Sequence, residues 1–313
     1  MILIGATGAT ERFEVKMKKL KIDKRYITSV VYVVVLLALV TLKWLVADWG
    51  ALGFDALFCA ISILGCLEFL NAVKIVPFAQ KVVTIAFCSA VIPLFVLCEM
   101  TAIGGYIPVG ILFVVYALVI VIFALASFDG SNINTTLLSL GASVYCGLLS
   151  CVFSAINHLQ ENSAPLVLLM FVTVMLTDSL AYIVGSIFKR WVPYKLAPKI
   201  SPNKTIIGGV GGIIGGIGAG IVAYYIWIGL SKVAGEAIVY SGSMPAVVAF
   251  LLIGLVGSIV GQAGDLFESF IKRKCGIKDS GKLLPGHGGV LDRFDSMFFV
   301  GVLVLIASML LVM

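Results

Sequence analysis

The chain has 313 residues, of which 61% are apolar and only 12% are charged, and its mean hydropathy is +1.13. Soluble domains carry about 25% charged residues, so this composition excludes an ordinary water-soluble protein. The net charge of +6 is interpreted as a consequence of membrane topology, because Lys and Arg collect on one side of membrane proteins. No nucleic-acid partner is expected.

Nine apolar runs follow one another along the chain, each close to the ~20 residues that a helix needs to cross a bilayer. They cover residues 27–47, 51–70, 82–100, 107–126, 134–155, 164–187, 205–230, 245–263 and 297–313. The second run carries two acids, Asp55 and Glu68. The pattern predicts an all-α polytopic membrane protein with about nine transmembrane helices.

The distribution of positive charge predicts the orientation of these helices. If the N-terminus is cytoplasmic, the inner segments hold 20 of the 22 Lys and Arg residues. Those segments are 1–26, 71–81, 127–133, 188–204 and 264–296. The bias follows the positive-inside rule, and an error of one helix would place a polar loop on the wrong side. We therefore expect a cytoplasmic N-terminus.

Polarity divides the chain into three parts. Residues 1–26 are predicted to form a basic cytoplasmic segment, in which 1–16 is interpreted as an extension or a mis-assigned start. Residues 27–155 are nearly featureless apolar helices and are expected to act as a scaffold. Residues 156–313 hold the dense polar motifs. They are expected to be the catalytic region, with cytoplasmic loops at 188–204 and 264–296.

The first polar motif lies inside the sixth apolar run. On a helix, Asp178, Tyr182 and Gly185 stand at positions i, i+4 and i+7, so one face presents an acid, a phenol and a gap. An ionised carboxylate is costly within a membrane and is usually functional there. The face is predicted to hold a polar ligand or a cation; the alternative is a protonated Asp178 that hydrogen-bonds to a neighbouring helix.

The second motif is a basic loop that leads into the seventh apolar run. Prolines exclude a helix before residue 203, so Lys195, Lys199 and Lys204 are expected on a constrained loop. Ser201 or Asn203 is predicted to cap the next helix, whose N-terminus favours an anion. The combination suits a phosphate, and an ordinary capped basic loop is the alternative.

Glycines repeat every four residues after this loop, at Gly208, Gly212, Gly216 and Gly220. Such a stripe allows another helix backbone to approach closely. The repeat is therefore interpreted as a packing surface, with a groove for a lipid chain as the less favoured alternative.

The third motif spans residues 261–296 and is the most polar part of the chain. If the eighth helix continues beyond the membrane, Asp265, Glu268, Ser269 and Lys272 share one of its faces. Asp292 and Asp295 are predicted to open the ninth helix. Carboxylates beside Lys and Arg suit Mg²⁺ and phosphate oxygens, which favours phosphoryl or nucleotidyl transfer. The alternative is a solvated run of mutually paired charges.

The third motif resembles, over its full length, the signature of the phosphatidate cytidylyltransferases, also called CDP-diacylglycerol synthases. The matching positions are Ser269, Lys272, Arg273, Lys278, Asp279, Gly281, Leu284, Pro285, His287, Gly288, Gly289, Asp292, Arg293 and Asp295. Two further segments agree, one from Asp178 to Gly185 and one from Ser201 to Gly208. The family usually has a glutamate where this chain has Ile207.

The resemblance implies a reaction, its cofactor and its partners. Phosphatidate and CTP would give CDP-diacylglycerol and pyrophosphate with Mg²⁺, and a second, monovalent or divalent, cation is compatible with the motif. The short cytosolic segments and the chain length favour a bacterial plasma (inner) membrane, and the charge distribution predicts a site at its cytoplasmic face. A homodimer is also compatible with the sequence.

The resemblance also yields a hypothesis for the roles of individual residues. The metal ligands are predicted to be Asp265 and Asp292, with Asp178 and Asp295 as additional ligands or supports. The groups that bind phosphate or act in catalysis are predicted to be Ser201, Lys204, Thr205, Lys272, Arg273, His287 and Arg293.

Three other functions remain as alternatives on the sequence. A polyprenol kinase would move the γ-phosphoryl group of CTP, and an ether-lipid phosphate cytidylyltransferase would act on a different acceptor. An ion-coupled transporter is the third, but the N-terminal half has no counterpart of the later motifs, whereas transporters commonly show internal repeats.

Overall fold

The structure is a computed structural model that describes residues 47–101, 103–126, 130–159, 163–234, 242, 244–281 and 288–312. Eight helices within these residues are long and apolar enough to span a membrane. They correspond to eight of the nine predicted runs and confirm the all-α polytopic class. The first run, except for residue 47, and the segment 1–26 lie outside the described residues.

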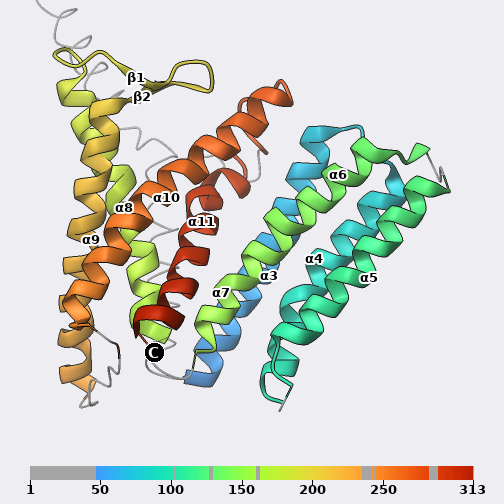
Figure 1. The fold of residues 1–313 in the computed structure, drawn as a ribbon, viewed down its shortest axis with the longest axis horizontal. Coiled ribbons are helices and arrows are strands. Elements are labelled where there is room, and N and C mark those ends of the chain that lie inside the picture. The colour runs from blue at the N-terminus through green and yellow to red at the C-terminus, as the bar shows by residue number, and fades with distance from the viewer. Residues whose placement is uncertain are drawn as a thin grey trace, which may run out of the picture.

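The described elements follow one another as antiparallel helices with one small hairpin (Figure 1). The helices are α3 (Ala47–Val73), α4 (Phe78–Glu99), α5 (Tyr106–Leu125), α6 (Ile133–Ala142), α7 (Leu149–Asn157), α8 (Ser163–Phe188), α9 (Ile206–Ala234), α10 (Ala246–Lys274) and α11 (Leu291–Ala307). Two π-helical segments are η2 (Ser143–Leu148), between α6 and α7, and η3 (Ser308–Val312), after α11. Two strands, β1 (Lys195–Ala197) and β2 (Ser201–Thr205), pair antiparallel.

Two predicted features of helix length are confirmed. Helix α10 continues to Lys274, so it carries its last turns beyond the apolar run that ends at 263. Helix α11 begins at Leu291, before the apolar run at 297, and Asp292 lies in its first turn. Both extensions carry polar residues of the third motif. These residues therefore stand on helix ends instead of on irregular loops.

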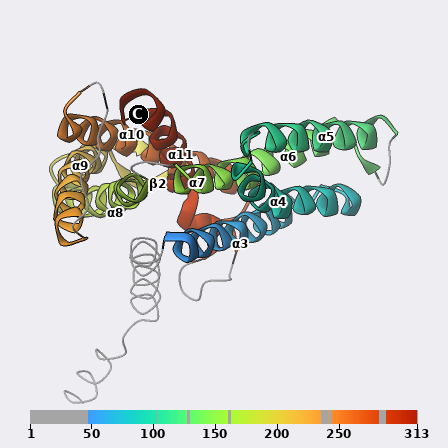
Figure 2. The same ribbon diagram turned by 90° about the horizontal axis from the view of Figure 1, so that it is seen from below.

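The helices form two outer groups with a central group packed between them. Helices α4, α5 and α6 lie on one side and α8 and α9 on the other, with α3, α7 and α11 between them (Figures 1 and 2). Aromatic side chains fill this junction. Phe58 of α3 stacks on Phe153 of α7 with ring centroids 4.1 Å apart, and Phe294 of α11 meets Phe58 edge-on at 5.9 Å. The N-terminal helices are thus packed directly against the helix that carries Asp292.

The glycine stripe of α9 is a packing surface, as predicted. A Cβ atom at Gly216 would overlap the carbonyl oxygen of Gly254, and one at Gly220 would overlap that of Phe250. Both carbonyls belong to α10. At Gly208 the added atom would lie 2.8 Å from the carbonyl oxygen of Ala181 on α8. The glycines therefore let α9 approach both neighbours at backbone distance.

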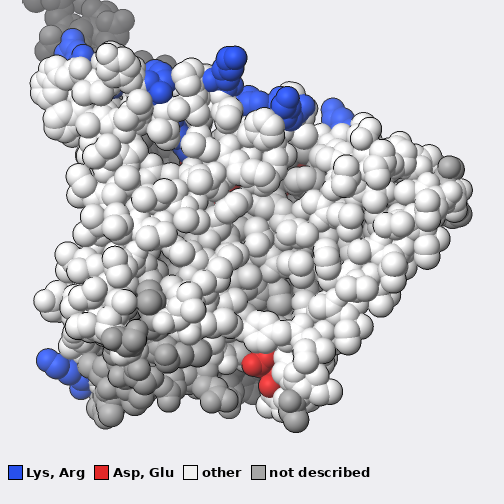
Figure 3. All heavy atoms as spheres, viewed as in Figure 1, with Lys and Arg blue, Asp and Glu red and all other residues white. Residues whose placement is uncertain are grey.

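Basic side chains gather at one end of the bundle. The connections α3–α4, α5–α6, α8–α9 and α10–α11 all lie at that end in Figure 1, and Figure 3 shows Lys and Arg along it. Lys232 lies in the last turn of α9, at the opposite end. Where they are described, the loops after residue 70 that are predicted to share one side of the membrane therefore share one end of the structure.

Both acids of α3 are buried and hydrogen-bonded, which explains how the helix tolerates them. At one end of α3, the Asp55 carboxylate accepts from Asn157 Nδ2 at 3.1 Å and contacts His158 Nε2 at 2.7 Å. At the other end, the Glu68 carboxylate accepts from the backbone N–H groups of Val290 and Leu291. Glu68 thus reaches the polar end of the molecule.

Candidate active site

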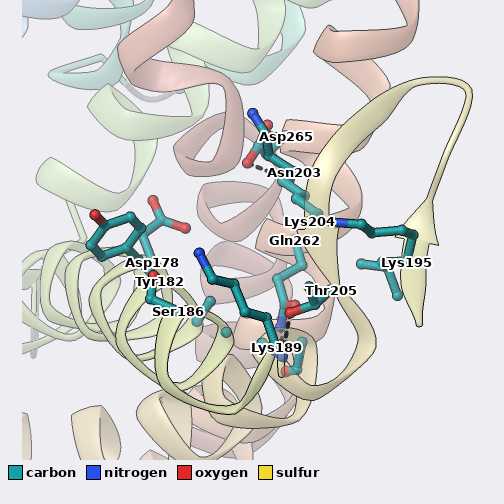
Figure 4. Close-up of a pocket in the computed structure, with 15 residues that line it drawn as sticks. Asp178, Tyr182, Ser186, Lys189, Lys195, Asn203, Lys204, Thr205, Gln262 and Asp265 are labelled. Atoms are coloured by element: carbon teal, nitrogen blue, oxygen red, sulfur yellow. Dashed lines mark hydrogen bonds and ion pairs between the residues drawn. The ribbon is translucent and has the colours of Figure 1, made fainter. Parts of the chain in front are cut away.

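A cavity of about 500 Å³ opens between α8, the hairpin, the start of α9 and α10. Figure 4 shows the labelled side chains of α8 on one wall and those of the hairpin and α10 on the other. The lining residues are Asp178, Ala181, Tyr182, Gly185, Ser186, Lys189, Lys195, Leu196, Asn203, Lys204, Thr205, Gly208, Gly209, Gln262 and Asp265. The cavity joins the first polar motif to the second and to the start of the third.

The α8 wall carries the face that the sequence predicts. Asp178, Tyr182 and Gly185 all line the cavity, and Ser186 and Lys189 extend it toward the helix end. Gly185 supplies a close approach: an added Cβ would lie 3.0 Å from Thr205 Oγ1 and 3.4 Å from the Cα of Gly208. The start of α9 can therefore sit directly against α8.

The opposite wall is the β1–β2 hairpin, which the sequence reasoning did not predict. Lys195 pairs with Thr205 and Ala197 with Ser201. Pro198 and Pro202 do exclude a helix before 203, as expected, but the chain forms paired strands instead of an irregular loop. A hairpin holds Lys195 and Lys204 on backbone that is fixed by pairing, so both lysines line the cavity.

The predicted cap of α9 was wrong in its residue. Neither Ser201 nor Asn203 caps the helix, because β2 continues in extended form to Thr205. Thr205 directly precedes α9, and its Oγ1 accepts a hydrogen bond from Gly208 N at 3.1 Å. This is the geometry of a helix cap. Thr205 thus has a structural role while it also lines the cavity.

The α10 wall contributes one acid and one amide. Asp265 forms an ion pair with Lys204 and accepts a hydrogen bond from Ser269 Oγ at 3.4 Å. Gln262, one turn earlier, donates from Nε2 to the carbonyl oxygen of Gly209 at 3.3 Å and fixes α10 to α9. The sequence reasoning missed Gln262, although its position three residues before Asp265 places it on the same helix face.

A second polar cluster lies where the end of α10 meets the start of α11. Lys272 forms ion pairs with Glu268 and with Asp292 Oδ1, the latter at 2.6 Å. Ser280 Oγ donates to Glu268 Oε1 at 2.6 Å, and the backbone N–H groups of Ser280 and Gly289 donate to Asp292 Oδ2 at 2.9 and 2.8 Å. Both carboxylate oxygens of Asp292 therefore already have donors.

Asp295 links the cavity to this second cluster. Its side chain is buried, Oδ1 accepts from Ser296 N at 2.6 Å, and the carboxyl groups of Asp265, Glu268 and Asp178 lie within electrostatic range of it. Asp178 in turn interacts electrostatically with Lys204 and with Arg293. Acids from three helices therefore share one electrostatic environment with the basic groups of the hairpin and of α11.

Three predicted residues lie elsewhere or cannot be placed. Arg273 donates from Nε to the carbonyl oxygen of Ile200 and from Nη1 to that of Ile277, both at 3.2 Å, so it ties the hairpin turn to the end of α10. Ser201 does not line the cavity. His287 lies outside the described residues.

The donor chemistry of the site suits a hard divalent cation. Among residues with described positions, no group of three or more His, Cys, Asp and Glu side chains is arranged to hold a metal ion. Mg²⁺ is usually held by one or two carboxylates and completed by water and substrate phosphate. Asp178 and Asp265 face the same cavity, so the residues present fit that mode of binding.

These features define a class: a polytopic membrane protein with a cavity lined by lysines and carboxylates at the basic end of its helices. The chain belongs to the cytidylyltransferase family, whose model matches residues 23–311. That match extends through the N-terminal helices, which carry none of the three polar motifs.

Similar proteins that are known as phosphatidate cytidylyltransferases support this membership. The phosphatidate cytidylyltransferase of Bacillus subtilis (strain 168) is 42% identical over 160 residues, which cover 51% of this chain and 53% of the relative. That of Staphylococcus haemolyticus is 40% identical over 148 residues, covering 45% and 48%. The chain spans about half the length of the relatives it matches.

Proposed function

We propose that the protein is a CTP:phosphatidate cytidylyltransferase, which makes CDP-diacylglycerol and pyrophosphate. The observation that carries the proposal is the cavity where Asp178 and Asp265 face Lys189, Lys195 and Lys204. Family membership and the names of the relatives support the same reaction.

The cavity suits two phosphate-bearing substrates that repel one another. Three lysines, one directly after α8 and two on the hairpin, offer positive charge to phosphate oxygens. The two side chains of the Lys204–Asp265 ion pair are 26% and 30% exposed, so an entering phosphate can bind Lys204 and release the Asp265 carboxylate. The acyl chains of phosphatidate would lie among the apolar helices, while the nucleotide enters from the polar end.

The transfer itself needs no general base. A phosphomonoester has a second pKa of about 6, so the phosphatidate phosphate arrives largely as a dianion. One of its oxygens attacks the α-phosphorus of CTP, a new P–O bond forms, and the bond to the β-phosphate oxygen breaks. Pyrophosphate leaves with the bonding electron pair. The residues of the chain therefore bind, orient and neutralise charge, as is usual in phosphoryl chemistry.

The cation is proposed to lie against two carboxylates, with two further carboxylates nearby. Asp178 and Asp265 would contact it in the cavity, with Asp295 as a buried support and Asp292 at the second cluster. A bound Mg²⁺ would neutralise charge on the reacting phosphates. Binding at Asp292 requires one of its present donors to be exchanged, because both of its oxygens are engaged. A second cation is also proposed. Arg293 and His287 are proposed to bind phosphate or to act in catalysis.

The location of the reaction is proposed from charge. The basic end would face the cytoplasm, where CTP is present, and the membrane would be the plasma membrane of a bacterium. The positive-inside rule supports this orientation, and the bacterial source of the relatives supports the membrane.

Product analysis with position-specific label tests the function. Purified protein receives phosphatidate, Mg²⁺ and CTP labelled at either the α- or the γ-phosphorus. We expect α-label in the lipid fraction, γ-label in pyrophosphate, and loss of both products when a chelator removes the metal. Label from the γ-position in lipid would instead indicate a kinase, and an unlabelled lipid fraction would contradict the proposed reaction.

A further inference from the structure

Glu68 of α3 is a buried acid that the reaction above does not use. Its Oε1 accepts from Val290 N at 3.0 Å and its Oε2 from Leu291 N at 2.9 Å. These amides lie at the start of α11, where helical N–H groups have no partner within the helix. A carboxylate at a helix N-terminus is also favoured by the helix dipole. One side chain of the N-terminal half therefore fixes the first turn of α11.

Two glycines of the polar segment pack against the same carboxylate. A Cβ atom at Gly281 would overlap Glu68 Oε1, and one at Gly289 would overlap Glu68 Oε2. At Gly289 the added atom would also lie 2.7 Å from Gly281 N. These contacts give a steric reason for glycine at both positions: the backbone must approach an acid that comes from a distant helix.

The stretch 289–291 is consequently held from two directions. Gly289 N donates to Asp292 Oδ2 at 2.8 Å, while the next two amides donate to Glu68. Asp292 follows Leu291 directly and contacts both Lys272 and Ser280. Any movement of the 289–291 backbone would therefore change the position of Asp292 relative to α10.

We propose that Glu68 is a positioning residue of the active site, which fixes Asp292 and, through it, Lys272 in the arrangement used for turnover. The effect on turnover rests on the proposed cytidylyl transfer, but the hydrogen bonds from Val290 N and Leu291 N to Glu68 do not. Helix α3 would then be a working part of the site and not only a scaffold.

Asp55 provides a matched comparison on the same helix. It is also a buried acid with two hydrogen-bonding partners, Asn157 and His158. At 1.5 Å per residue it lies about 20 Å from Glu68 along the axis of α3. Its partners are at the opposite end of the bundle, so its loss changes packing without touching the 289–291 stretch.

Amide hydrogen exchange tests the hydrogen bonds between Glu68 and the start of α11 without any need for turnover. In Glu68→Gln one of the two acceptor oxygens becomes an NH₂ group, which faces one of the two backbone N–H donors. We expect the peptide that contains Val290 and Leu291 to exchange about tenfold faster in this variant, because its local opening costs less free energy. Asp55→Asn should leave that peptide at the wild-type rate. Equal rates in Glu68→Gln and wild type would overturn the proposal.

Kinetics test the positioning role. We expect Glu68→Gln to lower kcat about thirtyfold or more with little change in KM for CTP, the pattern of an interaction lost in the transition state. Glu68→Asp keeps the charge and should recover part of kcat. Asp55→Asn should lower the melting temperature in detergent without this loss of kcat. Similar kcat losses in Glu68→Gln and Asp55→Asn would overturn the positioning role.

A further variant covers the case in which Glu68→Gln does not fold. Gly281→Ala keeps the acid but pushes a methyl group onto Oε1, so it should raise exchange at Val290 and Leu291 in the same way. Unchanged exchange in Gly281→Ala would contradict the proposal that Glu68 holds the 289–291 backbone in place. Wild-type protein that makes no cytidine-bearing lipid would refute the proposed function alone, since the exchange comparison would still decide the role of Glu68.

Discussion

Asp292 is the residue on which the third motif converges, since it contacts Lys272, Ser280 and Gly289 at once. Asp292→Asn removes the negative charge that faces Lys272 and one acceptor oxygen. We expect turnover to fall about a hundredfold or more, as when a preorganised electrostatic group is removed from an active site. The measurement is the rate of CDP-lipid formation by purified protein.

Glu99→Gln is a suitable control for this substitution. Glu99 ends α4 at the other end of the bundle, and its Oε2 accepts from Gly105 N at 2.8 Å. It therefore loses a comparable carboxylate–backbone contact far from the site. Near-normal turnover in Asp292→Asn, with Glu99→Gln also normal, would show that the charge at 292 is dispensable.

At the scale of elements, α9 depends on glycine where it packs against α8 and α10. Gly216→Ala would force a methyl group into the carbonyl oxygen of Gly254, so α9 and α10 must separate. We expect a destabilisation of about 1–3 kcal/mol, as for other overpacked contacts. Thermal unfolding in detergent measures it.

Gly218→Ala is the matched variant on the same helix. An added Cβ at Gly218 meets nothing within 4 Å, and alanine favours a helix over glycine by about 1 kcal/mol. This variant should therefore unfold at the wild-type temperature or above it. A lower melting temperature for Gly218→Ala than for Gly216→Ala would contradict the packing role of the stripe.

At the scale of the whole molecule, the basic end decides which side of the membrane holds the site. A membrane-impermeant amine reagent added outside intact cells should label Lys232 but not Lys189, Lys195 or Lys199, all of which have exposed side chains. Mass spectrometry of the labelled peptides measures the result. In opened membranes all four lysines should react, and labelling of the hairpin lysines in intact cells would reverse the proposed orientation.

Much of the site could be predicted because its signals are local. The spacing of Asp178, Tyr182 and Gly185 within one run predicts a shared helix face, and all three line the cavity. The spacing from Asp265 to Lys272 predicts another face, and the Ser269–Asp265 and Lys272–Glu268 contacts follow it. In both cases helical periodicity alone relates sequence position to direction in space.

Other parts of the site depend on partners that lie far away in the chain. The role of Glu68 at the start of α11 depends on the backbone N–H groups of Val290 and Leu291, which donate to its carboxylate. The cap of α9 depended on the strand pairing of Lys195 with Thr205, which carried the extended chain past both predicted caps. Arg273 was predicted to bind phosphate, and its role as a tie to the hairpin turn required the position of Ile200.

The sequence by itself determined that the chain crosses a membrane several times, which loops share one side, and where its acids and lysines concentrate. Those properties follow from composition and from periods of a few residues. A bilayer offers no hydrogen-bond partners to the backbone, so a long apolar run crosses it as a helix, which satisfies its own backbone groups. The tertiary structure alone decided that Asp178 and Asp265 face one cavity and that Glu68 holds the start of α11. Such contacts join residues far apart in the chain, and only the packing of helices against one another specifies them.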